Sequence, residues 1–445
     1  MNKKLFMVSL GCPKNLVDSE LMLASLSAQG YDICRQAEDA SLIVVNTCGF
    51  IQSAVEEAID EILSLGQLKN AEPDLRLVVT GCLVQRYGER LRAELPEVDL
   101  FLGTDNFIDI AARLNALDNK SQPENLEFQT PTFLMDSTCR RRISTPNHRA
   151  YLKISEGCSN RCSYCLIPQL RGPLRSRALD DLIVEAQRLE AAGVKELTLV
   201  GQDVTAYGLD FGPQGHKLPD LLAGLLAETA IPWLRMLYLY PNRIAPPLLN
   251  LMADNPRLLP YFDIPMQHAS DKVLHLMRRP YKQSDLISLI DQIRAIMPES
   301  AIRTTLIVGF PGEKEADIIK LEEFIAQVKL NHVGVFCYSN EEGCEAATLP
   351  EHCDEEQKEE RRQRIMTIQK GISAQVNREM IGKIEKVLVE GLSRETDLLL
   401  EGRSRFQAPD IDGSVYINSG TCNTGDMVNL KITDAHPYDL IGEIV

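Results

Sequence analysis

No apolar run in this 445-residue chain approaches the length that a bilayer-spanning segment needs. The first residues, MNKKLFMVSLGCPKN, contain only a short apolar stretch that Ser9, Gly11 and Pro13 interrupt, so they predict a strand and not a signal peptide. Twelve cysteines without an export signal favour reduced thiols and metal ligation over a disulfide framework. These absences predict a cytoplasmic protein without a membrane partner.

Positive charge is also scarce. The chain has 47 Lys and Arg against 63 Asp and Glu, a formal net charge of −16. This excess disfavours non-specific attraction to nucleic acid and favours a basic partner. The hydrophobic content of 44% and charged content of 25% are ordinary for a globular protein, and the length fits about three domains.

A fourth ligand is absent beside the cysteine triplet of SEGCSNRCSYCLIPQLRG. Cys158, Cys162 and Cys165 have the spacing Cys-x3-Cys-x2-Cys. Closed zinc and iron–sulfur sites take four protein ligands, so three thiolates predict a metal centre with one open position. The same spacing also describes one stripe of a helix, although the glycines and prolines of the segment favour a loop. A zinc site is the other alternative, but the next downstream histidine, His216, is too distant for a compact module.

A second set of three cysteines follows three predicted strands of the first segment. These strands alternate with amphipathic helical stretches and occupy residues 5–10, 42–47 and 75–81. The residues just past their ends include Cys12, Cys48 and Cys82. Because the carboxyl ends of parallel strands meet at one edge of a sheet, we expect the three thiols to converge there. For any single one, a buried structural cysteine is the alternative.

Later segments predict two further folds. Six strand-like runs alternate with helices and predict an incomplete (β/α)6 barrel with the triplet at its mouth, at 151–155, 196–202, 233–240, 261–267, 302–310 and 332–339. A charged helix at 354–380 leads to five short strands that predict a small closed or partly open β-barrel, at 386–391, 398–404, 414–419, 427–433 and 440–445.

The expected domains are 1–118, a linker at 119–143, 144–376 and 377–445. The linker is polar and rich in Pro and Asn, and its basic run Arg140–Arg142 is either a solvated patch or a contact with the acidic bulk of the protein.

The triplet, with Tyr164 just before its third cysteine, resembles the radical S-adenosylmethionine (SAM) superfamily, in which SAM chelates the open iron. The backbone at Gly201, Gln202 and Gly309 ends predicted barrel strands and would approach SAM closely. For the GFPGE segment at 309–313, a tight turn is the alternative. Nearby arginines either offset cluster charge or pair with the SAM carboxylate, or are ordinary surface residues: Arg161, Arg171, Arg175 and Arg177.

The whole layout resembles the methylthiotransferase family, in which three separated cysteines, a radical SAM core and a C-terminal TRAM barrel follow one another. A radical at carbon needs a group to attach, and a second open cluster would supply sulfur. Four segments resemble the branch that modifies the β-carbon of an aspartate in small-subunit ribosomal protein S-twelve, namely SLGCPKNLVDSE, LKISEGCSNRC, IPQLRG and DIPMQHAS. The resemblance implies a flavodoxin-like first domain and two 4Fe–4S clusters, at Cys158/Cys162/Cys165 and at Cys12/Cys48/Cys82. It also implies SAM as radical source and methyl donor, and a reducing flavoprotein partner.

Charge bears on the substrate independently. Residues 381–445 contain six Lys and Arg against eleven Asp and Glu. An RNA-binding barrel needs a positive groove, whereas an acidic one would attract a basic ribosomal protein, free or within the assembling subunit. An acidic surface kept for solubility is the alternative.

Two rival functions remain. A tRNA adenosine methylthiotransferase would share every cluster ligand, although the charge makes tRNA an unfavoured partner. An iron–sulfur carrier would be non-enzymatic, but such proteins fill all four ligand positions. The remaining cysteines lack compact metal spacing and are expected to be packed: 34, 139, 337, 344, 353 and 422. Gln267 and His268 are candidates for orienting the target, with structural roles as the alternative.

Overall fold

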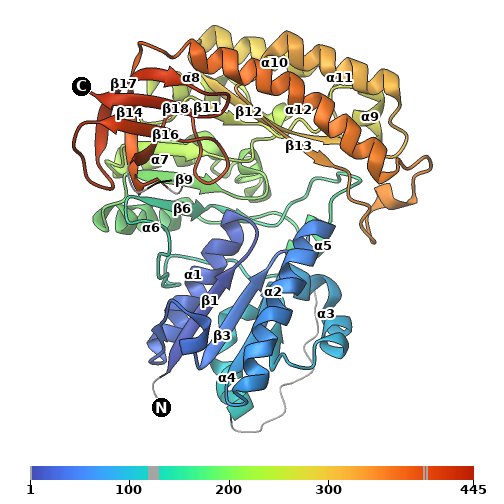
Figure 1. Ribbon diagram of the computed structural model, residues 1–445, viewed down its shortest axis with the longest axis vertical. Helices are drawn as coiled ribbons and strands as arrows, with labels where there is room; N and C mark the ends of the chain where they lie inside the picture. The colour runs from blue at the N-terminus through green and yellow to red at the C-terminus, as the bar shows by residue number, and fades with distance from the viewer. Residues whose placement is uncertain (1–2, 119–129, 394–395, 397–398) are drawn as a thin grey trace.

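The computed structural model describes residues 3–118, 130–393, 396 and 399–445. Figure 1 shows an α/β unit at the bottom of the view, a larger α/β core above it, and an all-β unit at the upper left. Part of the predicted linker, residues 119–129, lies outside the described residues. Within the described ranges, no helix combines the length and the apolar character needed to cross a membrane.

The first unit is a five-stranded parallel sheet in the order β2-β1-β3-β4-β5, which confirms the flavodoxin-like prediction. Its strands are β1 (Lys4–Ser9), β2 (Asp32–Ile33), β3 (Leu42–Thr47), β4 (Arg76–Gly81) and β5 (Leu100–Leu102). Every residue of β3 is buried, as expected for a parallel strand covered on both faces. Strands β2 and β5 escaped prediction because they have only two and three residues.

Helices cover both faces of this sheet. They are α1 (Pro13–Ala28), α2 (Gln52–Ala71), α3 (Cys82–Glu94) and α4 (Ile110–Asp118). Pro13 opens α1, where its missing N–H has no partner to lose. Apolar residues of α1 and α4 pack on one face of the sheet, and those of α2 and α3 pack on the other. The strand ends therefore stay open toward the core above.

The core holds six parallel strands in two halves, β6-β9-β10 and β11-β12-β13. The halves meet where the N–H of Leu239 donates to the carbonyl of Asp263 at 2.8 Å. No ladder between β13 and β6 closes the ring within the described residues. The incomplete barrel is thus confirmed. Its strands are β6 (Arg149–Lys153), β9 (Glu196–Val200), β10 (Trp233–Met236), β11 (Tyr261–Asp263), β12 (Ala301–Val308) and β13 (His332–Cys337).

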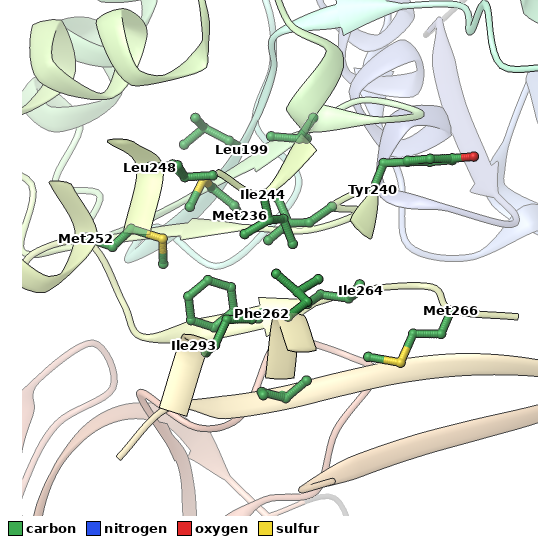
Figure 2. Close-up of a cluster of buried hydrophobic side chains, with 14 of the residues drawn as sticks. Leu199, Met236, Tyr240, Ile244, Leu248, Met252, Phe262, Ile264, Met266 and Ile293 are labelled. Carbon is green, nitrogen blue, oxygen red and sulfur yellow. The ribbon is translucent and has the colours of Figure 1, made fainter. Parts of the chain in front are cut away.

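Amphipathic helices bury the outer face of these strands. Figure 2 shows Met236 and Phe262 of the strands packed with Leu248, Met252 and Ile293 of the helices. The helices are α6 (Leu179–Ala191), α7 (Leu218–Glu228), α8 (Pro246–Asp254), α9 (Asp271–Leu276), α10 (Gln283–Ile296) and α11 (Glu315–Val328). The predicted connecting helix is α12 (Glu355–Arg378), which packs on α11 and β13 and so covers the last strand. A short helix α5 (Ile167–Arg171) and the hairpin of β7 (Ser155–Glu156) and β8 (Arg175–Ser176) follow the first strand.

The C-terminal unit is a closed barrel in the order β14-β15-β16-β18-β17. Its strands are β14 (Ile384–Leu392), β15 (Leu400–Ser404), β16 (Val415–Ser419), β17 (Met427–Ala435) and β18 (Leu440–Ile444). Buried ion pairs seat it on the core: Glu196 of β9 receives Arg403 of β15 and Arg235 of β10, both at 2.6 Å. Asp410 pairs with Arg149 at 2.8 Å. Part of the negative charge of this barrel is therefore neutralised by ion pairs with the core.

Candidate active site

The thiols of Cys12, Cys48 and Cys82, here called the strand-end triad, converge as the parallel topology predicts. Cys12 precedes α1, Cys48 follows β3, and Cys82 is the first residue of α3. A Cβ on Gly11, whose φ is +90°, would lie 2.8 Å from the Cβ of Cys48, so glycine permits this close approach. The three side chains interact electrostatically with one another. That they ligate a metal stays a prediction.

The chemistry of the strand-end triad fits a metal centre. Burial, and to a smaller extent repulsion from Cys82, raises the pKa of Cys48 to about 12. Burial likewise raises the pKa of Cys82, although the guanidinium of Arg171 opposes that effect. Such thiols stay protonated at neutral pH unless a metal displaces their protons. Three converging thiols, two of which have a pKa raised by burial, therefore suit a metal cluster better than three free thiolates.

Cys158, Cys162 and Cys165, the loop triad, occupy an irregular segment after β7, so the helical alternative is excluded. Gly157, with φ of +73°, lets this loop pass so close to Pro173 that a Cβ would lie 2.0 Å from the proline carbonyl oxygen. Burial raises the pKa of Cys158 and Cys165. All three cysteines line a cavity of about 550 Å³, which Cys344 also borders. The cavity gives the loop triad space for a bound group.

Arg171 connects the loop segment to the strand-end triad. Its Nε donates to the Sγ of Cys82 at 3.3 Å, and one of its terminal nitrogens pairs with Asp18 at 2.6 Å. Of the four arginines considered, it is thus the one that contacts a predicted ligand, in the other triad. Arg177 pairs instead with Asp181 and Glu185, Arg175 donates to backbone carbonyls, and Arg161 is exposed at the rim of the cavity.

A buried ionic network surrounds Arg171 and joins the first unit to the core. Lys153, at the end of β6, pairs with Asp18 of α1 and with Glu156 at 2.8 Å. Gln202 donates to Glu156 at 2.8 Å. Burial would raise the pKa of Glu156, but Lys153 and Arg171 outweigh it and lower that pKa. The network fixes the two triads relative to each other.

The four residues predicted to contact SAM differ from one another in their neighbours in the structure. Tyr164 packs edge-on against Phe310, with ring centroids 6.4 Å apart. Gly201 offers its carbonyl to Lys14 at 3.3 Å, and the Oε1 of Gln202 is buried without a hydrogen-bond partner among the described residues. A Cβ on Gly309 would lie 2.3 Å from the Cγ of Lys358, so this turn makes room for α12. Their role in binding SAM stays a prediction.

The two candidates for orienting a target differ. His268 is fully buried; its Nδ1 accepts from the N–H of Ser270 at 2.8 Å, and its Nε2 lies 3.3 Å from Glu313. These contacts favour the structural role. Gln267 has a φ of +71° and a buried Oε1 that lacks a hydrogen-bond partner among the described residues. It therefore keeps a free polar atom for a ligand.

Sequence reasoning missed three residues of this region. Lys14 lies over the ring of Tyr238, 3.8 Å from its centroid, and Arg279 donates to the Sγ of Cys162 at 3.4 Å. Lys14 is only two positions from Cys12, and that proximity of a cation to a predicted ligand was the available signal. Nothing in the local sequence marks Tyr238 or Arg279, because they reach the site from distant segments, Tyr238 just after β10 and Arg279 between α9 and α10.

Within the described ranges, no three His, Cys, Asp or Glu side chains are arranged to hold a single metal ion. Iron–sulfur clusters are bound differently, because each thiolate ligates its own iron atom. Two separate sets of three thiols, neither of which forms a closed single-metal site within the described part of the chain, thus suit two clusters with open positions better than zinc.

Three family models match the chain. Residues 4–103 match the uncharacterized protein family UPF0004, residues 152–325 match the radical SAM superfamily, and residues 381–445 match the TRAM domain. In chain order, the three matches fall within the lower α/β unit, the larger α/β core and the all-β unit of Figure 1.

Full-length relatives share one name. The chain is 50% identical to the ribosomal protein uS12 methylthiotransferase RimO of Desulfotalea psychrophila, over 99% of each chain. It is also 50% identical to the protein of that name from Pelobacter propionicus, over 99% of this chain and 98% of the relative. The RimO of Geotalea uraniireducens is 47% identical, over 100% and 99%.

Solved structures share the fold at much lower identity. The radical SAM methyltransferase TsrM of Kitasatospora setae, with cobalamin and a 4Fe–4S cluster bound, has a TM-score of 0.57 at 14% identity. The match covers 76% of this chain and 75% of TsrM. The cobalamin-dependent SAM radical enzyme OxsB, with SAM bound, has a TM-score of 0.53 at 12% identity, over 83% and 56% of the chains.

Proposed function

This chain belongs to the family of ribosomal protein uS12 methylthiotransferases, and we propose that it adds a methylthio group to the β-carbon of an aspartate in uS12, the S-twelve protein of the small subunit. The observation that carries the proposal is the pairing of two three-cysteine sets across one buried network. Arg171 contacts Cys82 of the strand-end triad and stands six residues after Cys165 of the loop triad. Each triad supports assignment of one 4Fe–4S cluster.

When bound, two clusters and SAM supply the electron, the hydrogen-accepting deoxyadenosyl fragment, the sulfur and the methyl group of such a transfer. We assign the loop triad to the cluster that holds SAM, because it borders a cavity large enough for a small molecule. We assign the strand-end triad to the sulfur-bearing cluster. Reducing equivalents come in this proposal from a flavoprotein.

The chain's own residues position and shield the reactants. Lys153, Glu156, Arg171 and Asp18 are all buried and hold the first unit against the barrel mouth. A rigid mouth of this kind keeps water from reactive carbon species and fixes their distance from the sulfur. Arg171 donates to Cys82, and Arg279 donates to Cys162, so each triad has one guanidinium beside a ligand thiol.

The charge of the chain, as well as its relatives, supports a protein over tRNA as the substrate. The C-terminal residues 381–445 carry eleven Asp and Glu against six Lys and Arg. Some of these acids pair internally, yet a barrel that binds RNA backbone needs a positive groove, which this composition does not favour. A basic ribosomal protein fits the same surface better.

The test uses anaerobically reconstituted protein with SAM, a sulfur source and a strong reductant. We would offer uS12 and, separately, unmodified tRNA, and read both by mass spectrometry while measuring deoxyadenosine. A methylthio gain on an aspartate of uS12, with tRNA unchanged, is the expected result. Methylthiolation of tRNA alone would show instead that the protein has the rival function, that of a tRNA adenosine methylthiotransferase.

Two variants separate the assigned roles. Cys158→Ala should abolish deoxyadenosine formation and uS12 modification together. Cys12→Ala should keep deoxyadenosine formation and lose only the sulfur transfer, because the loop triad stays intact. Equal behaviour of the two variants would contradict the division of labour.

A further inference from the structure

Lys14 extends from the strand-end triad to the mouth of the barrel. It stands in the first turn of α1, two positions after Cys12, and its side chain is buried with 8% residue exposure. Its Nζ donates to the carbonyl of Gly201, one residue past the end of β9, at 3.3 Å. The ammonium group therefore lies between the two units, where the strand-end triad faces the core.

The positive charge of Lys14 has no carboxylate partner among the described residues. Most other buried lysines and arginines form an ion pair with Asp or Glu; examples are Lys153, Arg171, Arg177 and Arg235. The other exception in the described part of the chain is Arg279, which donates to the thiol of Cys162. Lys14 instead uses one donor on a backbone carbonyl and lies over an aromatic ring. A buried cation of this kind is costly unless an anion accompanies it at work.

The position of Lys14 at the start of a helix further disfavours a positive charge without an anion. The first turn of a helix already carries partial positive charge from its free N–H groups, and α1 has no acidic residue in that turn. A lysine in that turn adds its own charge to an electrostatic potential that is already positive. Helix N-termini with an adjacent cation are favourable places for a carboxylate or another anion.

Tyr238 forms the floor beneath the ammonium group. Its φ of +61° is in the left-handed region, which is disfavoured for a bulky residue and recurs at functional sites. The N–H of Tyr238 donates to Asp263 at 2.9 Å, and its carbonyl accepts from the N–H of Val204 at 3.0 Å. These bonds fix the backbone of Tyr238, and the interaction of its side chain with Cys12 puts it beside the strand-end triad.

We propose that Lys14, supported by the ring of Tyr238, binds the carboxylate of the target aspartate and so selects an acidic side chain as substrate. The inference rests on the proposed function, which supplies a substrate with a carboxylate one bond from the reacting carbon. An ammonium group held between the strand-end triad and the end of β9 would fix that carbon between the sulfur source and SAM. A nucleobase offers no carboxylate, so the same contact discriminates against tRNA.

The test is a double-mutant cycle on binding, with reconstituted full-length protein and no reductant. The probes are uS12 and uS12 in which the modified aspartate is replaced by asparagine. The wild-type protein should bind the aspartate form about tenfold more tightly, as expected for a charged hydrogen bond. Lys14→Met should remove this preference, and Lys14→Arg should keep part of it.

A matched control and a stability measurement exclude a merely structural role. Lys217 also donates to backbone carbonyls, those of Gly208 and Gly212, but belongs to a loop before α7, so Lys217→Met should leave the preference unchanged. Without substrate, Lys14→Met should unfold at the same or a higher temperature, because it removes an unpaired buried charge. A large loss of thermal stability would instead assign Lys14 to the fold and overturn the proposal.

Two further outcomes separate the proposal from its premise. If Lys14→Met keeps the aspartate preference but binds SAM more weakly, the anion is the SAM carboxylate and the proposal is wrong, while the uS12 function stands. If the wild-type protein neither binds nor modifies uS12, the proposed function fails and the assignment of Lys14 fails with it.

Discussion

Arg171 and Cys82 are 89 residues apart in the chain, yet the Nε of Arg171 donates to the Sγ of Cys82 at 3.3 Å. The same guanidinium pairs with Asp18 of the first unit and approaches Glu156 of the core at 3.5 Å. One side chain thus ties a predicted cluster ligand to the interface between two units. Because this side chain is buried and charged, its replacement should weaken that interface.

Arg171→Leu should strongly destabilise the interface, because it leaves Asp18 and Glu156 buried with Lys153 as their remaining cation. Breaking a buried ion pair typically costs about 3–5 kcal/mol. Denaturant unfolding measures the loss. Arg175→Leu is the control, since Arg175 donates to backbone carbonyls and should lose much less. Equal losses for the two variants would show that Arg171 has no special role in the interface.

Cys82→Ala should reduce bound iron by about half after anaerobic reconstitution, because one of two clusters loses a ligand. Cys344→Ala is a matched control: both residues are buried in the same small apolar cluster, but Cys344 belongs to neither triad. We expect it to keep its full iron content. Iron analysis and absorbance spectra measure both, and a large loss in Cys344→Ala would add that thiol to the loop triad.

Docking of the C-terminal barrel should weaken in acid through Glu196, which is fully buried. Burial would raise the pKa of Glu196, but Arg403 and Arg235 outweigh it and lower that pKa from 4.5 to about 2. A carboxyl group with a depressed folded-state pKa stabilises the fold above its unfolded pKa, and this stability is lost as pH falls from about 4.5 toward 2. Thermal unfolding measured over this range should show the loss.

The variant Glu196→Gln should lower stability near neutral pH and flatten the pH dependence between 4.5 and 2. Glu228→Gln, at an exposed position at the end of α7, should leave the wild-type profile unchanged. An undiminished acid slope in Glu196→Gln would assign the transition to other carboxyl groups.

Gly157→Ala should disrupt the loop triad. The new methyl group would lie 2.0 Å from the carbonyl oxygen of Pro173 and 2.5 Å from that of Gly172, and backbone atoms cannot move aside cheaply. Gly193→Ala isolates the cost of positive φ, because its φ is +95° and, apart from its chain neighbours, no heavy atom of the described residues lies within 4 Å of the added carbon. That cost is about 1–2 kcal/mol. Only Gly157→Ala should also lose iron from the loop triad; similar iron contents would contradict the close approach.

Much of the fold was predictable from local patterns. Period-two and buried apolar runs located strands such as β3 and β12 within one or two residues. The same patterns missed β2 and β5, because strands of two and three residues are too short to show periodicity. Parallel topology then predicted that Cys12, Cys48 and Cys82 would converge, since strand ends share an edge.

Side-chain partners were less predictable. The basic run at Arg140–Arg142 had two possible roles, and the structure buries Arg141 against Glu20 at 2.6 Å and against Glu185. Nothing in RRR distinguishes the buried arginine from its neighbours. Similarly, the acidic composition of residues 381–445 did not reveal that Asp410 pairs with Arg149 and Glu385 with Arg405.

The sequence by itself determined the strand and helix order, the two sets of cysteines and the kinship of the chain, because periodicity, ligand spacing and motifs are properties of neighbouring residues. Only the tertiary structure decided which charges meet. Lys153 and Arg171 found carboxylates across the interface, whereas Lys14 found a carbonyl and an aromatic ring. The reason is physical: the energy of a charge depends on its distance from other charges and on its burial, and both are fixed only when distant segments pack.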